Sequence, residues 1–320
     1  MLEIGGSVPQ VDIEMLFRLL VDARRQMDPR ERDRMASLLA SIVNSRVPRA
    51  APESSPMIDG ASARLSAEGL CAIKELLRPE KVAAVAAYFR SRPCFNAHVH
   101  AESDGVPRHL GEGAEAFHYG CYALSDVIGA PHLIELANDT QLIAIAERYL
   151  GCTPTLYSLN AWWSFPGLGQ RARVSQSFHR DIDDFRFCTL FVYLTDVDER
   201  GGPHVYVRRT HRANLLSREI PGVQDAMLCG EGYGLDDAIN RSLGHLIETV
   251  LGSAGDGLIA DTHGFHMGLP PERERLIFWA RYGLHASVGP SSAPVERETV
   301  ARRIPWSERA AYINRTLVRG

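Results

Sequence analysis

The sequence predicts a mainly β protein with flanking helices, and three observations point to this fold class. From Thr153 onward the chain consists of short segments rich in aromatic and β-branched residues, as strands are. Turn residues separate these segments, for example Gly201-Gly202-Pro203 and Gly255-Asp256-Gly257. No regular series of helices alternates with them. Short strands without alternating helices favour an antiparallel sandwich or barrel over a parallel sheet.

The expected strands follow one another closely in the second half of the chain. They are TLYSLNAWWSF, VSQSFH, RFCTLFVYLTDV, PHVYVR, DGLIAD and RLIFWARYGL. One segment interrupts the series: residues 214–252 contain helical stretches, most clearly LDDAINRSLGHLIETVL. We therefore expect a helical insertion between two strands at about 214–252.

The first 60 residues predict a helical extension joined to a larger domain. Apolar spacing indicates one helix from Val11 and a second from about Pro29 to Val43, while residues 46–62 are rich in Pro, Ser, Ala and Gly and predict a linker. Residues 1–60 are thus an extension with a role in packing or dimerisation, and residues 61–320 the main domain.

The main domain is expected to open with a strand and two helices. The strand lies at 69–77, and one helix begins at Pro79 and runs to about Arg90. The other helix is capped by Asp139 or Thr140 and ends where Gly151 follows Leu150.

Composition narrows the classes of function. The chain has 320 residues, of which 45% are hydrophobic and 23% charged, as in a globular protein. A net charge of −4 gives no reason to expect nucleic acid as a partner, and no long uncharged apolar stretch predicts a membrane span. Six scattered cysteines form no C-x-x-C pair, and the first residues lack a secretory pattern, so we expect a cytoplasmic protein with reduced thiols.

The segment His179-Arg180-Asp181 carries the clearest chemical signal. In a strand, residues i and i+2 point to the same side, so an H-x-D triplet can direct an imidazole and a carboxylate at one point. A second imidazole from a distant strand completes a facial triad for iron(II) with open positions. His266, after the turn and apolar strand GDGLIAD, is the expected third ligand.

Other residues compete for these roles. His98-x-His100 is a rival metal pair in an irregular region, where a loop or pocket-lining role is the simpler interpretation. His263 differs from His266 in strand parity and is expected to face elsewhere. Asp183 and Asp184 are either carboxylates that orient a ligand histidine or solvated loop residues.

The stretch 153–285 resembles the phytanoyl-CoA dioxygenase family of Fe(II)/2-oxoglutarate oxygenases. The matching pieces occur in order: SLNAWWSFPG, HRD, LFVYLTDVDERGGPHVYVRRTHR, GDGLIADTHGFHMG and Arg275. The resemblance implies a double-stranded β-helix (jelly roll, cupin-like) core, with Fe(II) and 2-oxoglutarate as cofactors. It also implies that Arg275 pairs with the far carboxylate of 2-oxoglutarate, with Arg281 on the same face as its competitor.

Two positions depart from the family pattern. The residue two after the distal histidine is often Ser or Thr in relatives and contacts the co-substrate, but here it is Gly268. Thr189 is the candidate that could replace this hydroxyl. The Gly-Ser-His turn of relatives is Arg209-Thr210-His211 in this chain.

The resemblance implies an enzyme that hydroxylates a small-molecule metabolite with O2 and releases succinate and CO2. Related halogenases have Gly or Ala at the carboxylate position, so the presence of Asp181 favours oxygen insertion. Desaturation, ring closure or epimerisation would use the same ligands. The alternatives from other classes are a cupin-like metalloenzyme that does not use 2-oxoglutarate and a non-catalytic binding protein on an oxygenase barrel. The substrate cannot be read from the loops at 93–130 and 214–252, and a homodimer is possible.

Overall fold

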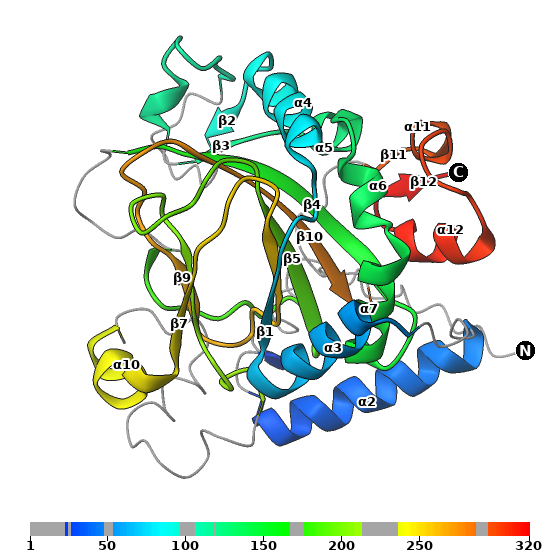
Figure 1. Cartoon of the computed structure of the whole chain (residues 1–320). Helices are drawn as coiled ribbons and strands as arrows, with labels where there is room; N and C mark the ends of the chain where they lie inside the picture. The colour runs from blue at the N-terminus through cyan, green and yellow to red at the C-terminus, as the bar shows by residue number, and fades with distance from the viewer. Residues whose placement is uncertain are drawn as a thin grey trace, which may run out of the picture.

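The core of the chain is built from two antiparallel sheets, with helices around them (Figure 1). The structure is a computed structural model, and it describes residues 23–24, 27–47, 54–96, 106–117, 119–166, 176–212, 236–285 and 294–320. Within these residues two β-sheets form the centre of the fold and helices flank them, as the sequence predicts.

The larger sheet has seven strands and the smaller has three. In sheet order, the larger consists of β1 (Leu70–Ile73), β8 (Gly257–Ala260), β5 (Phe187–Tyr193), β10 (Arg275–Gly283), β4 (Thr155–Ser164), β3 (Tyr119–Cys121) and β2 (Phe95–Asn96). The smaller consists of β7 (Ile247–Val250), β6 (His204–Val207) and β9 (His266–Gly268). A short parallel pair, β11 (Val295–Glu296) and β12 (Val318–Arg319), lies near the C-terminus.

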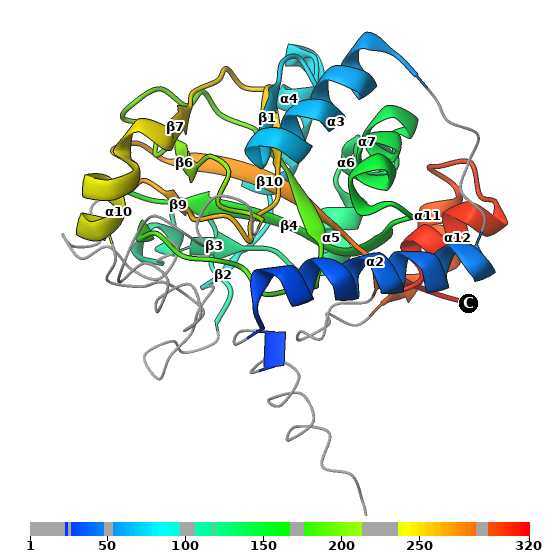
Figure 2. The same cartoon turned by 90° about the horizontal axis from the view of Figure 1, so that it is seen from below.

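Helices pack on the face of the large sheet that is turned away from the small one (Figure 2). They are α2 (Pro29–Arg46), α3 (Pro56–Glu68), α4 (Pro79–Arg90), α5 (Leu124–Gly129), α6 (Leu133–Ala137), α7 (Thr140–Leu150), α11 (Arg297–Ala301) and α12 (Glu308–Asn314). Beside the small sheet lies α10 (Asp236–Leu243), and two 3-10 turns occupy Ala114–Ala116 and Gly244–Leu246.

Strand β10 shows how the two faces of the large sheet differ. Leu276 and Phe278 belong to the main core under the helices, whereas Ile277 and Trp279 pack in the cluster between the two sheets. Side chains alternate along a strand, so Arg275 and Arg281 share the inner face with Ile277 and Trp279. The inner face is therefore where polar side chains of β10 can meet residues of the small sheet.

Several element boundaries agree with the sequence prediction. Helix α4 covers Pro79–Arg90, and α7 is capped by Asp139 and followed by Gly151 in the left-handed conformation, with φ 83°. Five of the six expected strand segments contain the strands β4, β5, β6, β8 and β10. Of the sixth, the described part forms an isolated bridge between His179 and His266 rather than a strand.

The expected linker at 46–62 is wrong in its second half, because α3 begins at Pro56. Ser55 is the N-cap, its hydroxyl accepting from the Ile58 N–H at 3.2 Å, and Pro56 occupies the first turn. The Ser and Pro that predicted a linker thus start a helix. Ile58 and Leu65 then bury its inner side.

The expected helical insertion ends earlier than residue 252, where the described residues can be compared with the prediction. Residues 213–235 lie outside the described residues, α10 ends at Leu243, and Ile247–Val250 form strand β7 against β6. The β-branched Ile247, Thr249 and Val250 suit this edge strand. The strand expected at 69–77 is confirmed only as Leu70–Ile73, after which Glu75 adopts a positive φ of 55°.

Some expectations fall on residues that the structure does not describe. These are the first helix from Val11, the linker residues 48–53, and the rival pair His98 and His100. None of the helices in the described ranges is long and apolar enough to cross a membrane.

Helix α2 is part of the packed core. Ala36, Ala40 and Val43 are buried in the main core cluster. The guanidinium of Arg32, 5% exposed, lies 3.4 Å from the backbone carbonyls of His211 and Asp184. The N-terminal helix thus packs against segments that lead to the candidate site.

The N-cap of α7 provides a test of these local interactions. Asp139 Oδ1 accepts from the N–H groups of Gln141 at 2.9 Å and Leu142 at 3.2 Å, so Asp139→Ala should lower the free energy of unfolding by about 1 kcal/mol. Urea titration measures this change. Arg78→Ala is the matched control, because Arg78 is the N-cap of α4 and makes no capping bond. Equal losses in the two variants would contradict the assignment.

Candidate metal centre

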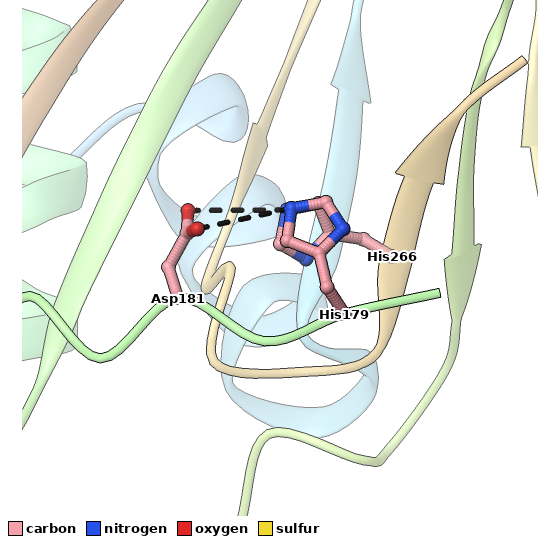
Figure 3. Close-up of side chains that lie close together, drawn as sticks. All are labelled: His179, Asp181 and His266. Carbon is pink, nitrogen blue, oxygen red and sulfur yellow. Dashed lines mark ion pairs between the residues drawn. The ribbon is translucent and has the colours of Figure 1, made fainter. Parts of the chain in front are cut away.

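Three ligand-type side chains converge between the two sheets (Figure 3). His179, Asp181 and His266 each offer one atom, and these atoms lie within 4.8 Å of one another. The Nε2 atom of His179 is 3.9 Å from Asp181 Oδ1, and that of His266 is 3.8 Å from Asp181 Oδ2. Two imidazoles and one carboxylate at this spacing can hold a divalent transition metal on one face.

Backbone pairing brings these residues together from distant parts of the chain. His179 and His266 exchange two backbone hydrogen bonds, of 3.0 and 3.1 Å, in an isolated antiparallel bridge. The N–H of Asp181 donates to the carbonyl of Thr262 at 2.9 Å. The H-x-D segment is therefore fixed along the turn between β8 and β9.

Both imidazoles are oriented by the backbone close to them. Nδ1 of His179 is 2.9 Å from the carbonyl of Ser177, and Nδ1 of His266 is 2.9 Å from the carbonyl of Gly264. A carbonyl only accepts, so Nδ1 carries the proton in each ring. The Nε2 lone pairs are thus left facing Asp181, as metal binding requires.

Arg281 holds the carboxylate of Asp181 from the side. Its guanidinium donates to Asp181 Oδ2 at 3.1 Å and is also ion-paired with Asp183. The hydroxyl of Tyr157 donates at 3.0 Å to Oδ2 of Asp183, the oxygen that also pairs with Arg281. Among the described residues, Asp183 is therefore neither a solvated loop residue nor a partner of a ligand histidine: it holds Arg281, which in turn holds the carboxylate of Asp181.

Electrostatics in the site favour the metal-binding forms of Asp181 and His266. Burial alone would raise the pKa of Asp181, but the charge of Arg281, together with His266, His179 and a hydrogen bond from Thr262, lowers that pKa to about 2. Burial, with a further contribution from His179, lowers the pKa of His266 to about 3. Near neutral pH the carboxylate is therefore ionised and the His266 ring is neutral.

His263 and Asp184 lie close to the site but point away from the ligand atoms. His263 is not among the three converging residues; its Nδ1 donates to the backbone carbonyl of Asp181 at 3.1 Å, and its Nε2 is 3.4 Å from the guanidinium of Arg180. Asp184 is buried and accepts the N–H groups of Leu284 and His285 at 2.8 and 3.0 Å. Both residues brace the loop that carries Asp181.

Arg275 lies at the start of β10, on the same inner face as Arg281. It is 8% exposed, donates to the carbonyl of Gly202 and is 3.1 Å from the hydroxyl of Ser164. Gly202 has a φ of 71°, and a Cβ there would lie 2.7 Å from the carbonyl oxygen of Leu269, so the turn that meets Arg275 requires glycine. Unlike Arg281, Arg275 makes no ion pair with any carboxylate in the described ranges.

Several buried nitrogen atoms near the triad lack hydrogen-bond partners among the described residues. They include Nε of Arg275 and of Arg281, Nε2 of His204 and Nε1 of Trp279. A buried polar group without a partner is costly, and each such case calls for a ligand, a water or an ion. Arginine Nε and indole Nε1 are obligate donors, and the two arginines carry a positive charge, so the surroundings suit an anion.

The hydroxyl of Thr189 lies near Arg281 and not near Arg275. Thr189 is fully buried on β5, pairs in register with Arg281, and its Oγ1 lies 3.4 Å from Oγ1 of Thr262. Thr262 in turn bonds to Asp181. Thr189 is therefore linked through Thr262 to the candidate ligand Asp181, and a contact with a co-substrate stays a prediction.

The Arg209-Thr210-His211 turn has a conformation that glycine normally adopts. Arg209 has a φ of 67°, and its guanidinium pairs with the carboxylate of Glu68 at 3.0–3.1 Å. Thr210 Oγ1 donates to the carbonyl of Val207 at 2.7 Å and accepts the N–H of Phe265 at 2.8 Å. The turn is thus tied to the segment leading to His266 in spite of the departure from the family pattern.

Sequence reasoning missed one residue of the site and gave another a different role. His204 was not singled out, although it follows Gly201-Gly202-Pro203 directly and shares strand parity with Tyr206. Arg281 was weighed only as a carboxylate anchor. Its partner Asp183 lies on another segment, so only the fold reveals the ion pair.

No protein-family model matches the chain, and no curated protein matches it. Among solved structures, similarity is found to the non-heme alpha-ketoglutarate-dependent epimerase SnoN from nogalamycin biosynthesis, with 20% identity over 71% of this chain and 82% of that one and a TM-score of 0.48.

Two further structures contain 2-oxoglutarate. HygX from Streptomyces hygroscopicus with nickel and 2-oxoglutarate bound has 17% identity over 77% of this chain and 92% of that one, with a TM-score of 0.48. EvdO2 from Micromonospora carbonacea var. aurantiaca complexed with 2-oxoglutarate has 14% identity over 73% and 93%, with a TM-score of 0.49. At these identities and TM-scores the similarity does not establish the family of this chain.

Arg281 yields a prediction about metal affinity. Arg281→Met should weaken binding of Mn²⁺ or Ni²⁺ by about 10- to 100-fold, because partners that orient a ligand usually have effects of this size. The charge of Arg281 does not repel the ion strongly, since Asp183 neutralises it. Calorimetric titration without co-substrate measures the change. Arg273→Met is the matched control, because Arg273 is exposed and pairs only with Asp198 in the described part of the chain. Tighter metal binding in Arg281→Met would contradict the orienting role.

Proposed function

We propose that this chain is a non-haem iron(II)- and 2-oxoglutarate-dependent dioxygenase that hydroxylates a small molecule. The observation that carries the proposal is the meeting of two features on one inner surface. One is the triad of His179, Asp181 and His266 with both Nε2 lone pairs available. The other is the buried Arg275, which has no carboxylate partner among the described residues.

The donor set fits iron(II). Two neutral imidazoles and one carboxylate on one face form the triad typical of non-haem Fe(II) oxygenases, and such a triad leaves further positions for a co-substrate and O2. A closed structural zinc site would need a fourth protein ligand. The group of three is the complete set that the described residues offer at this point.

The surroundings fit a dicarboxylate as co-substrate. A guanidinium can pair with a carboxylate through two parallel hydrogen bonds, and the Nε atoms of Arg275 and Arg281 are both buried without a partner in the described residues. Arg281 is already engaged by Asp181 and Asp183. Of the two competing arginines, Arg275 is therefore the one we assign to the far carboxylate of 2-oxoglutarate.

Bound iron and 2-oxoglutarate would supply the oxidising chemistry, in which O2 is consumed and succinate and CO2 are released. The chain's own residues hold the ion and the co-substrate and exclude water from the site. His179, Asp181 and His266 hold the ion, Arg281 keeps the carboxylate of Asp181 in place, and Arg275 orients the co-substrate. The half-buried aromatic rings of Trp162 and Phe191 pack with the cluster between the sheets and shield this space from water.

Finer assignments belong to the same proposal. We assign the chain to the phytanoyl-CoA dioxygenase-like enzymes, with the two sheets as a double-stranded β-helix core, in the cytoplasm. Hydroxylation is the expected outcome because Asp181 occupies the carboxylate position; desaturation, ring closure and epimerisation share these ligands. Thr189 is retained as a second co-substrate contact. A cupin-like enzyme without 2-oxoglutarate would have no use for Arg275, and a non-catalytic binding protein would have no use for the triad.

The first experiment tests the cofactors. Fe(II) and 2-oxoglutarate are added to anaerobic protein, and we expect a weak visible charge-transfer band that bleaches in air with formation of succinate. His179→Ala should lose the band because it removes a ligand, whereas His245→Ala should keep it because His245 is exposed away from the triad. Iron binding without a band or succinate would refute the 2-oxoglutarate assignment and leave the cupin-like alternative.

The second experiment tests Arg275. Arg275→Met should raise the Kd of 2-oxoglutarate by roughly thirtyfold or more, because breaking a buried charge pair costs at least about 2 kcal/mol. Arg275→Lys should fall between wild type and Arg275→Met, since lysine keeps the charge and loses the planar fork. Arg273→Met, two residues earlier and exposed, is the control. An unchanged Kd in Arg275→Met would place the carboxylate elsewhere.

A further inference from the structure

His204 lies beside the metal ligand His266 and close enough to Arg275 for that charge to act on it. It begins β6, the middle strand of the small sheet, and its ring lies nearly parallel to that of His266, with the centroids 5.5 Å apart and the planes at 21°. On its other side the ring of Phe191, from the large sheet, is 4.9 Å away. His204 is therefore held between the two sheets, next to a metal ligand.

The direction of the His204 side chain follows from strand parity. Val205 and Val207 pack in the outer cluster with α10, whereas Tyr206 packs in the cluster between the sheets. His204 shares parity with Tyr206 and so faces inward. The charge of Arg275 contributes to the electrostatic environment of His204, as do those of His266 and Asp181. The imidazole thus lies within electrostatic range of both ends of the proposed co-substrate site.

The buried Nε2 atom of His204 has no hydrogen-bond partner among the described residues. The residue is 6% exposed, and its Nε2 has no hydrogen bond to any residue in the described ranges. Nearby apolar rings cannot satisfy it. A buried nitrogen in this condition fits a ligand with oxygen acceptors.

Position 204 also lies opposite the departure at Gly268. In the β6–β9 pair, His204 and Gly268 are register partners, and both follow the inward parity of His266. Gly268 has no side chain that could contact a co-substrate at this position of the strand. Thr189, by contrast, pairs with Arg281 at the other end of β10, six residues or about 20 Å along the strand from Arg275.

We propose that His204 is a co-substrate-binding residue whose Nε2–H donates to a carboxylate oxygen of 2-oxoglutarate, supplying the polar contact that Gly268 lacks. The inference rests on the proposed function and deepens it. It assigns the selectivity for an acidic co-substrate to His204 together with Arg275.

The experiment compares two affinities in anaerobic full-length protein. The Kd of Fe(II) is measured without co-substrate, and the Kd of 2-oxoglutarate is measured from the visible band of the iron-loaded protein. His204→Phe keeps an aromatic ring beside His266 and removes the donor, so the Kd of 2-oxoglutarate should rise by about 10- to 100-fold while that of Fe(II) stays unchanged. His204→Gln restores an N–H donor and should recover part of the loss.

Each outcome separates this inference from the proposed function. If the wild type gives no band with 2-oxoglutarate, the proposed function fails and the role of His204 fails with it. If the wild type binds 2-oxoglutarate and His204→Phe binds it equally well, the inference alone is overturned. Parallel loss of Fe(II) and 2-oxoglutarate affinity in His204→Phe, or a loss only in Thr189→Val, also overturns it. His245→Phe, at an exposed position, is the control for a change of histidine to phenylalanine.

Discussion

The two backbone hydrogen bonds between His179 and His266 are the interaction on which the rest of the site depends. They join the segment that contains His179 to the first residue of β9, 87 positions later in the chain. This bridge places two imidazoles side by side, with ring centroids 4.2 Å apart. Asp181 then follows by strand geometry, since its N–H continues the pairing at Thr262.

A layer of buried polar residues supports this bridge from behind. The carboxylate of Asp261 accepts from the Tyr149 hydroxyl and from the N–H of His263, and the Tyr206 hydroxyl donates to the Asp261 carbonyl at 2.8 Å. Gly264 is required here, because a Cβ would lie 2.0 Å from the Tyr206 hydroxyl oxygen. The turn between β8 and β9 is thus held by α7 on one side and β6 on the other. Networks of this kind are stable when every member has a partner.

The sequence predicted the elements whose signals are local. Aromatic and β-branched residues dominate two segments and predict them as strands, Thr155–Ser164 and Arg275–Gly283. The starts of α4 and α7 are indicated by Pro79 and Asp139. The prediction failed where one residue type has two uses. Ser55 and Pro56 serve equally in a linker and at a helix start, and only the buried side of α3 decides between them.

The same contrast between local sequence signals and tertiary contacts applies to the site. The H-x-D triplet and the distal histidine have spacings that can be recognised in a chain, and the structure brings these three residues together. The roles of Arg281 and His204 depend on partners from other strands, Asp183 and Gly268, which no local pattern connects with them. Whether an arginine anchors a ligand or a protein carboxylate is decided by tertiary contacts alone.

Each imidazole ligand is hydrogen-bonded to a carbonyl very close to it in sequence, and this affects how an ion would bind. Each ring is oriented by a carbonyl only two residues away in its own chain, at Ser177 and at Gly264. The rotamer and tautomer of the two ligands are therefore set when the chain folds, before any ion arrives. The conformational entropy of ordering these side chains is lost during folding and not during capture, so the site is preorganised. An incoming ion would meet a rigid receptor, and its size and preferred geometry would decide whether it stays.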